Sequence, residues 1–400
     1  MGAPRLLHVF PSFSIGGIES RTCRIINHYG KASDHVIFSV HNDYSIGERL
    51  LPNTSVRLLA DVRCPSGIPA RLVFYRRLLR RVNPDLLLTY NWGSFDCVAS
   101  YSLFRPCPLI HAQHGFTADE SDGQKGYRAL LRRILLRRAS YLVVPSQGLV
   151  EIAANDWKIP GAKIRYMKNG IDLDRYSVSA DTAGAGIRRR GETIIGSVGS
   201  LSTIKNHQRL LRVFSRLGRR ENVRVCLVGD GSERTRLQQY AEDHGIADRV
   251  LMVGYREDVH AMLREFDIFC LPSDSEQMPH ALIEAMASGL PAVATDVGDV
   301  KSMVSEENRR FIVSVADEDG FLRNVRVLLD DPRLRRRLGE ANRARAWREF
   351  GQENMYREYG ALYRRAIHEW KRFRSGSHPE KTPGTSRRAR GDTQKNGCRH

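Results

Sequence analysis

Short apolar runs of strand length alternate with amphipathic stretches of helical length along almost the whole chain, and this alternation restricts the fold more than any other feature. In the first half, the apolar runs fall at residues 6–10, 36–40, 85–90, 109–112 and 141–145. Strands that alternate with helices in this way lie parallel in a helix-covered sheet. The first half is therefore predicted to be a Rossmann-like α/β domain.

The same pattern starts again after a stretch rich in Ser, Ala, Gly and Arg, with apolar runs at 193–198, 223–228, 250–253, 268–271 and 292–294. We therefore expect two tandem Rossmann-like domains, residues 1–175 and 191–350, joined by a linker at 176–190. An Arg- and Glu-rich helical stretch then runs from residue 333 to about 372. Its last part, 351–373, is expected to cross back over the first domain.

The chain is basic, with 63 Lys and Arg against 45 Asp and Glu and a net charge of +18. Such a charge attracts nucleic acid, anionic lipid or phosphorylated substrates, and charge alone does not choose among them. Residues 374–400 hold seven Lys or Arg against two acids (7 − 2 = +5), and their composition predicts a disordered tail. Segments 71–81 and 128–138 mix Arg with apolar residues, which suits either anionic lipid headgroups or solvated helix faces.

The cysteines and the hydropathy bear on location. The seven cysteines are scattered and none has C-x2-C spacing, which favours a reducing compartment over disulfides or structural zinc. No stretch approaches the roughly 18 uninterrupted apolar residues of a membrane span, and residues 1–17 fit a first strand better than a signal peptide. The expected location is the cytoplasm, with peripheral contact at the inner face of the plasma membrane.

Each domain opens with a strand that ends in a glycine turn. The first turn holds Gly16 and Gly17, and the second, at 196–201, precedes Lys205. Glycines at a strand-to-helix turn let backbone N–H groups approach an anion, and a lysine nearby can neutralise a diphosphate leaving group. Taken alone, each turn also fits a plain tight connection, and Lys205 a solvated charge.

The most informative segment runs from a strand at 268–271 through a loop that contains Glu276 into a helix that starts near Pro279 and contains Glu284. In an open α/β sheet, ligands bind beyond the carboxyl ends of the strands. Glu276, Lys205 and the Gly16–Gly17 turn are therefore expected to converge at one cleft, where a carboxylate can accept hydrogen bonds from hydroxyl groups such as those of a sugar.

The spacing from Glu276 to Glu284, followed by A-x-x-E-A-M-A-x-G-x-P, resembles the E-x7-E signature of the retaining glycosyltransferases of family 4 (group 1), which have the GT-B fold. Segments at 143–146, 169–172, 227–231 and 253–255 extend the resemblance over most of the chain. It implies that two domains face a cleft, an acceptor domain at 1–175 and a domain at 191–350 that binds a nucleotide diphosphate-sugar donor, and that the enzyme needs no cofactor or metal. The resembling bacterial enzymes mostly act on exopolysaccharide, capsule or lipopolysaccharide acceptors, including lipid-linked saccharides.

The resemblance also implies roles for residues. Glu276 contacts the donor sugar, Lys205 holds the diphosphate, and His114, at a strand end, turns toward the transferred sugar, which makes these three the catalytic candidates. Glu284 binds the ribose hydroxyls. The remaining donor-binding candidates are the backbone of Gly16, Gly17, Met278, Pro279, His280 and Ala281, the position of Ser200, and Gly254, Tyr255 and Arg256 near the base.

The sequence departs from the family pattern at two positions, since Ser200 stands where the family usually has Arg and Gln277 where it often has Gly. Both departures bear on donor affinity and donor identity. No residue is an obvious nucleophile or general base. Asp172 and Asp174 form a D-x-D, the manganese motif of another glycosyltransferase fold, but their place beside the linker favours coincidence.

Three alternative functions can be compared by the sequence features that each one requires. A nucleotide-sugar epimerase shares the fold, but the E-x7-E element and Lys205 favour transfer. A nucleic-acid binder fits the charge of +18, but the chain lacks a recognisable binding module. A dinucleotide oxidoreductase needs G-x-G-x-x-G and an acidic residue about twenty positions on, which the Gly16–Gly17 turn does not supply.

Overall fold

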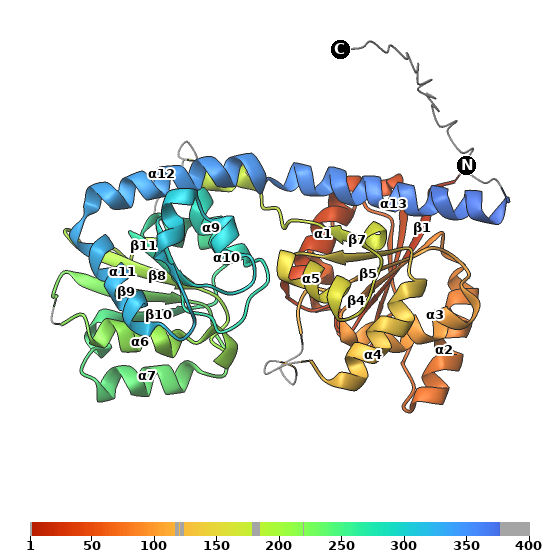
Figure 1. Cartoon of the computed structure of the whole chain (residues 1–400), viewed down its shortest axis with the longest axis horizontal. Coiled ribbons are helices and arrows are strands. Elements are labelled where there is room, and N and C mark those ends of the chain that lie inside the picture. The colour runs from red at the N-terminus through yellow and green to blue at the C-terminus, as the bar shows by residue number, and fades with distance from the viewer. Residues whose placement is uncertain (1, 117–119, 121–123, 178–184, 219, 377–400) are drawn as a thin grey trace, which may run out of the picture.

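The structure is a computed structural model that describes residues 2–116, 120, 124–177, 185–218 and 220–376 (Figure 1). The expected basic tail lies outside this part from residue 377 on, as do residues 178–184 of the expected linker. Two parallel sheets form two domains side by side, which confirms the predicted fold class.

The first domain is a seven-stranded sheet in the order β3-β2-β1-β4-β5-β6-β7. Its strands are β1 (Arg5–Phe10), β2 (Asp34–Ser39), β3 (Val56–Leu58), β4 (Leu86–Tyr90), β5 (Leu109–Ala112), β6 (Tyr141–Val144) and β7 (Ile164–Tyr166). The helices of this domain are α1 (Gly17–Tyr29), α2 (Ile68–Val82), α3 (Phe95–Phe104), α4 (Gly126–Leu135) and α5 (Gln147–Asn155).

The second domain is a six-stranded sheet in the order β10-β9-β8-β11-β12-β13. The strands are β8 (Thr193–Val198), β9 (Val223–Val228), β10 (Val250–Gly254), β11 (Ile268–Leu271), β12 (Ala292–Thr295) and β13 (Ile312–Val313). Around them lie α6 (His207–Ser215), α7 (Arg234–Asp243), α8 (Val259–Arg264), α9 (His280–Ala287), α10 (Val300–Met303), α11 (Glu318–Asp330) and α12 (Pro332–Glu349).

The order of the strands in each sheet determines where a ligand crevice opens. The direction of winding reverses between β1 and β4 in the first sheet and between β8 and β11 in the second. At such a switch point the loops on the two sides separate, so a crevice opens beyond the carboxyl ends of these strands. The segments that follow β1, β4, β8 and β11 are therefore the ones placed to build a site.

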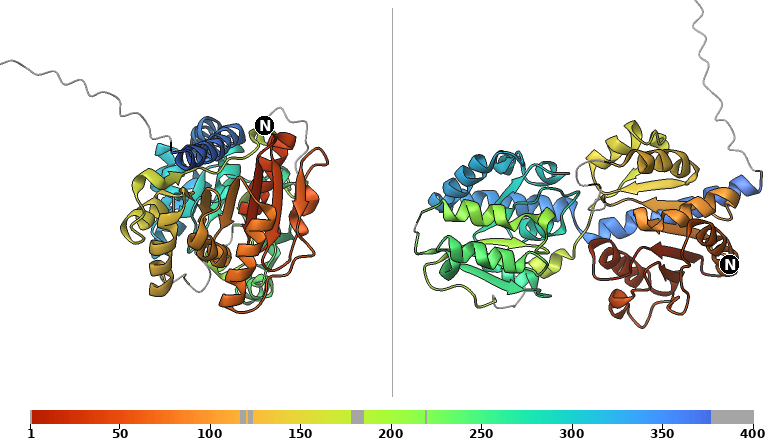
Figure 2. Two further views of the ribbon diagram at one scale, coloured as in Figure 1. Left: turned by 90° about the vertical axis from the view of Figure 1, so that its right-hand side faces the viewer. Right: turned by 90° about the horizontal axis from the view of Figure 1, so that it is seen from below.

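The long helical stretch at the end of the described chain is divided in two. α12 covers the second domain, and α13 (Gln352–Arg374) crosses the first domain, where Tyr356, Tyr359 and Tyr363 are buried (Figures 1 and 2). The break lies at Gly351, where the Ile171 amide donates to the Phe350 carbonyl and the Gln352 amide donates to the Ile171 carbonyl, both at 2.9 Å. The end of the first domain thus interrupts the helical hydrogen bonds where the chain crosses between domains.

Candidate active site

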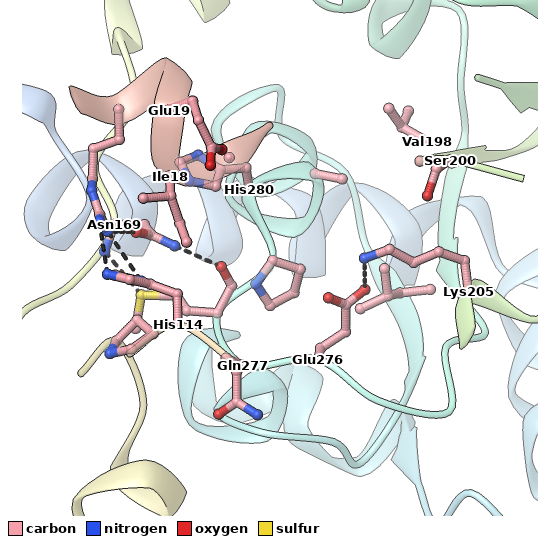
Figure 3. A pocket seen from close by; sticks show the side chains of 18 of the residues that line it. Ile18, Glu19, His114, Asn169, Val198, Ser200, Lys205, Glu276, Gln277 and His280 are labelled. Atoms are coloured by element: carbon pink, nitrogen blue, oxygen red, sulfur yellow. Dashed lines mark hydrogen bonds and ion pairs between the residues drawn. The ribbon is translucent and has the colours of Figure 1, made fainter. Parts of the chain in front are cut away.

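A cavity of about 480 Å³ lies between the two domains at the predicted crevice (Figure 3). The first domain contributes the start of α1, the ends of β4 and β5, and Asn169. From the second domain come the segment after β8, the loop after β11 and the start of α9. The lining residues are Gly17, Ile18, Glu19, Arg21, Asn91, His114, Pro145, Asn169, Val198, Gly199, Ser200, Lys205, Leu271, Glu276, Gln277, Met278, Pro279, His280 and Ala281.

Lys205 and Glu276 form an ion pair in this cavity. The Lys205 ammonium donates to Glu276 Oε1 at 2.5 Å, and the Ser273 hydroxyl donates to the same oxygen at 2.9 Å. Lys205 ends a short 3-10 helix, η8 (Thr203–Lys205), after β8, while Glu276 follows β11, so neighbouring strands hold the two residues. The carboxylate is thus held by a lysine and a hydroxyl on the wall that the second domain forms.

Two helices begin at the cavity. Pro279 is the N-cap of α9, and its side chain makes no capping hydrogen bond, so the first-turn amides of α9 face the cavity without a capping side chain. At the start of α1, the Glu19 carboxylate folds back, so that a Cβ on Gly16 would lie 2.3 Å from Glu19 Oε2. Burial raises the pKa of Glu19. The N-terminus of α9 is therefore the one placed to meet an anion.

His114 is held on the opposite wall by an arginine that the sequence did not suggest. The buried Arg21 guanidinium donates to His114 Nε2 at 2.7 Å and to Asn169 Oδ1 at 3.1 Å, and lies 5.2 Å from the centre of the Tyr359 ring of α13. The His114 amide donates to Asn91 Oδ1 at 2.9 Å. Burial, with the nearby Arg21, lowers the pKa of His114 well below its ordinary value, so the ring is neutral.

The loop that carries Glu276 is bound to the first domain. The side-chain amide of Asn169 donates to the Met278 carbonyl at 2.8 Å (Figure 3). His280 lies close to α1, where a Cβ on Gly17 would come 3.8 Å from its ring. Burial and the nearby arginines lower the pKa of His280 to about 3, so this histidine is neutral as well.

A second cavity of about 300 Å³ adjoins the first and shares Val198, Gly199 and Ser200 with it. Its walls include Asp230, Tyr255 and Arg256, the last two of which were expected near the base. Gly229 approaches so closely here that a Cβ would lie 1.9 Å from the Gly199 carbonyl oxygen, which leaves room for no side chain. The turn after β9, which holds Gly229, therefore packs against the turn after β8, which holds Gly199.

Three of the predicted residues line neither cavity. Gly16 is the N-cap of α1, and Gly254 ends β10 beside Tyr255. Glu284 lies on α9 beside Arg24 of α1 and Tyr176, and burial raises the pKa of its carboxyl. The remaining predicted site residues line one or both cavities.

Sequence reasoning missed Arg21, Arg24 and Tyr176. The two arginines lie one turn apart on α1, where Arg21 lies over Tyr359 of α13 and Arg24 lies near Tyr356 of α13 and Glu284 of α9, and only tertiary packing gives them this position. Asp172 and Asp174 lie beside the linker and line neither cavity. Among the described residues, no group of three or more His, Cys, Asp or Glu is arranged to hold a metal ion.

Comparison with known proteins identifies the family. Residues 15–175 match the family described as Glycosyltransferase Family 4, and residues 184–345 match that described as Glycosyl transferases group 1. Anabaena HepE, solved in complex with UDP, superposes with a TM-score of 0.76 at 18% identity over 90% of this chain and 99% of that one. This likeness shows a shared fold.

Three relatives show the extent of similarity. EpsF of Bacillus subtilis, described as a glycosyltransferase, is 30% identical over 73% of this chain and 79% of its own. The Escherichia coli UDP-Gal:alpha-D-GlcNAc-diphosphoundecaprenol alpha-1,3-galactosyltransferase is 25% identical over 65% and 70%. The match to N-acetyl-alpha-D-glucosaminyl L-malate synthase of Bacillus anthracis, 28% identical, spans 43% of this chain and 45% of that enzyme. The chain belongs to the glycosyltransferases of family 4 (group 1), which have the GT-B fold.

Proposed function

We propose that the chain transfers a sugar from a nucleotide diphosphate-sugar to a cell-envelope glycan or lipid-linked saccharide, with retention of anomeric configuration and without a metal ion. The observation that carries this proposal is the Lys205–Glu276 pair, which lies across the cavity from the neutral His114 and beside the N-terminus of α9. These groups supply what sugar transfer needs: positive charge for a departing diphosphate, and hydrogen-bond acceptors for sugar hydroxyls.

Each group has a distinct part in the proposed step. The bond between the anomeric carbon and the diphosphate breaks, and its electron pair leaves with the phosphate oxygen. Lys205 and the α9 amides stabilise the charge that develops on this oxygen. Lys205 leaves Glu276 as it turns to the diphosphate, which frees the carboxylate to accept hydrogen bonds from the sugar.

Retention follows if the acceptor hydroxyl attacks the face that the diphosphate leaves. The acceptor proton then passes to the departing phosphate oxygen, and no side chain serves as the general base. His114, held neutral by burial and Arg21, orients the sugar hydroxyls without adding positive charge at the reacting carbon. Ser200 faces both cavities and offers a hydroxyl, in place of a second cation, to the diphosphate.

A donor panel tests this proposal. We expect one among UDP-, GDP-, ADP- and CMP-linked sugars to be hydrolysed slowly and to stabilise the protein thermally, with the same rate in EDTA. At a hundredfold excess over Kd, binding adds about 2.7 kcal/mol to the free energy of unfolding. UDP-sugars are the first choice because the HepE structure holds UDP. Loss of turnover in EDTA contradicts metal independence, and no response to any donor contradicts transfer.

The proposed acceptor is a lipid-linked saccharide or a growing polysaccharide of a bacterial envelope. The Escherichia coli relative is named for a diphosphoundecaprenol acceptor. Such acceptors lie at a membrane, so an enzyme that uses them must work at the bilayer surface. We place this enzyme in the cytoplasm, in contact with the inner face of the plasma membrane. In the described part of the chain, no helix has the length and hydropathy to cross a bilayer.

Helix α4 supports membrane contact because its apolar stripe faces away from the protein. Tyr127, Leu130, Leu131 and Ile134 lie at positions i, i+3, i+4 and i+7 and are all exposed. The buried residue of α4 is instead Arg132, which donates two hydrogen bonds to the buried Glu120, both at 2.9 Å. The usual orientation of an amphipathic helix is thus reversed.

The surroundings of this stripe are basic. Residues 68–82 and 126–138 each hold five arginines and no acidic residue. Helices α2, α3 and α4 lie on one side of the first sheet (Figure 1), and Ile68, Val73 and Leu103 add further exposed apolar side chains. An apolar stripe within a basic surface matches an anionic bilayer, where the side chains enter the interface and arginines meet phosphate groups.

Vesicle sedimentation tests this contact. The wild type is expected to bind phosphatidylglycerol vesicles at low salt and phosphatidylcholine vesicles at least about tenfold more weakly. Leu130→Glu with Ile134→Glu should lower binding to the anionic vesicles by about tenfold or more, while Val327→Glu, at an exposed apolar position of the second domain, should not. Equal binding by all three proteins contradicts the contact. A wild-type dimer that the double variant abolishes assigns the stripe to a second copy of the chain.

A further inference from the structure

The N-terminus of α5 in the first domain meets a carboxylate of the second domain. Asp299 Oδ1 accepts a hydrogen bond from the Gln147 amide at 2.8 Å, and Oδ2 accepts one from the Tyr166 hydroxyl at 2.9 Å. Asp299 is buried, although it lies in the turn between β12 and α10. Both oxygens of this side chain are therefore used by the other domain.

The contact suits the charge of α5. The first turn of α5 contains no acidic residue of its own. The hydroxyl oxygen of its N-cap, Ser146, accepts a hydrogen bond from the Leu149 amide at 3.2 Å. A helix N-terminus carries a partial positive charge and free amides, which a carboxylate stabilises. Asp299 supplies this negative charge from across the domain boundary.

Asp299 is also joined to the loop that carries Glu276. Its amide donates to the Gln277 carbonyl at 2.8 Å. The preceding Gly298 packs so tightly that a Cβ would lie 2.4 Å from the Glu276 carbonyl oxygen and 2.5 Å from that of Gln277. The Ser146 hydroxyl, in turn, donates to Gln277 Oε1 at 2.5 Å. Helix α5, Asp299 and the Glu276 loop are thus one hydrogen-bonded unit.

We propose that Asp299 is a positioning residue for sugar transfer, which docks α5 of the acceptor domain onto the Glu276 loop and fixes that loop against the first domain. This inference rests on the proposed function, because it assigns Asp299 a part in the same reaction. Gln277 belongs to the docking contact through its bond from Ser146. When α5 is undocked, the donor still binds the second domain, but Glu276 and His114 no longer face the sugar together.

The test compares Asp299→Ala and Asp299→Asn with Asp296→Asn, the matched control. Asp296 lies in the same turn, is exposed, and pairs with Lys301 of its own domain at 3.2 Å. Asp299→Ala should lower kcat for donor turnover about tenfold to a hundredfold, because two interdomain hydrogen bonds are lost, and change the donor KM less than about threefold. Asp299→Asn keeps hydrogen-bonding groups at both positions and should recover part of kcat.

Hydrogen exchange provides a readout that needs no activity. In Asp299→Ala, the amides at 147–149 should exchange at least about tenfold faster than in the wild type, while the strands of both sheets keep their protection. A folded Asp299→Ala with unchanged kcat, or unchanged exchange at 147–149, overturns the inference. If the wild type turns over no donor, the proposed function fails, and the exchange measurement still decides whether Asp299 docks α5.

Discussion

Replacing Lys205 with alanine should lower donor turnover by about 10²- to 10³-fold, which is the cost of removing a charge that stabilises the leaving group in a closed site. Lys205 is held at 2.5 Å from Glu276 beside the N-terminus of α9, which is where the proposed mechanism puts the diphosphate. The loss should appear mainly in kcat, because the charge on the leaving oxygen grows as the sugar bond breaks. Steady-state kinetics with the donor found in the panel measure it.

Three further variants serve as comparisons for this result. Lys301→Ala removes an exposed lysine that pairs with Asp296 and should leave turnover unchanged. Glu276→Gln removes the charge that holds Lys205 but keeps a side chain that forms hydrogen bonds. It should therefore reduce turnover, but less than Glu276→Ala does. A Lys205→Ala enzyme that works at the wild-type rate contradicts the role of the pair.

The second large effect is loss of stability in mild acid. Burial lowers the pKa of several histidines below the usual value, among them His8, His35, His111, His114, His207 and His280. For His35, His111 and His207 the pKa falls to about 4. In the unfolded chain the same rings take up protons near pH 6.5. The unfolded state therefore binds more protons below that pH, so the free energy of unfolding falls as the pH falls.

The size of the effect follows from linkage. Each such histidine lowers the free energy of unfolding by about 1.4 kcal/mol per pH unit between its unfolded and folded pKa values. Denaturant unfolding at pH 7.5, 6.5 and 5.5 should show a plateau and then a steep fall. His35→Asn should flatten this fall, whereas His244→Asn, at an exposed position, should not. A stability that is constant down to pH 5 contradicts neutral buried histidines.

The histidine network also shows why the first core tolerates polar groups. The rings of His8 and His35 share a hydrogen bond at 2.9 Å, and His8 bonds the Tyr90 hydroxyl at 2.9 Å, all within the sheet formed by β1, β2 and β4. Both ring nitrogens of His8 thereby have partners without a charge, whereas the buried His35 Nε2 has none among the described residues. No pattern in the sequence marks His8, His35 and Tyr90 as partners, because they lie on three separate strands, β1, β2 and β4, which only the fold brings together.

The sequence predicted the central strands because buried parallel strands are continuous apolar runs. It missed β3, β7 and β13, which have two or three residues each, lie at sheet edges and are partly exposed. It also predicted a helix from residue 333 to about 372 without the break at Gly351, since the interruption comes from Ile171, far away in the chain.

The residues of the candidate site also fall into those that the sequence could predict and those that it could not. Glu276, Lys205 and the start of α9 could be predicted because each follows a strand whose carboxyl end faces the crevice. Arg21 could not, because its position depends on Tyr359 of α13 and on His114. Helix α4 shows a related limit: its periodicity predicts an amphipathic helix, but only the fold reveals that Arg132 faces inward and the apolar stripe outward.

The measurement that tests the central claim most directly follows the anomeric proton by NMR while the enzyme, in EDTA, consumes an α-linked nucleotide sugar chosen from the donor panel. A retaining, metal-independent transferase should release or transfer the sugar first as the α-anomer, with the β-anomer of any free sugar appearing later through mutarotation. Initial formation of the β-anomer, or consumption only when a divalent metal is restored, would contradict the account.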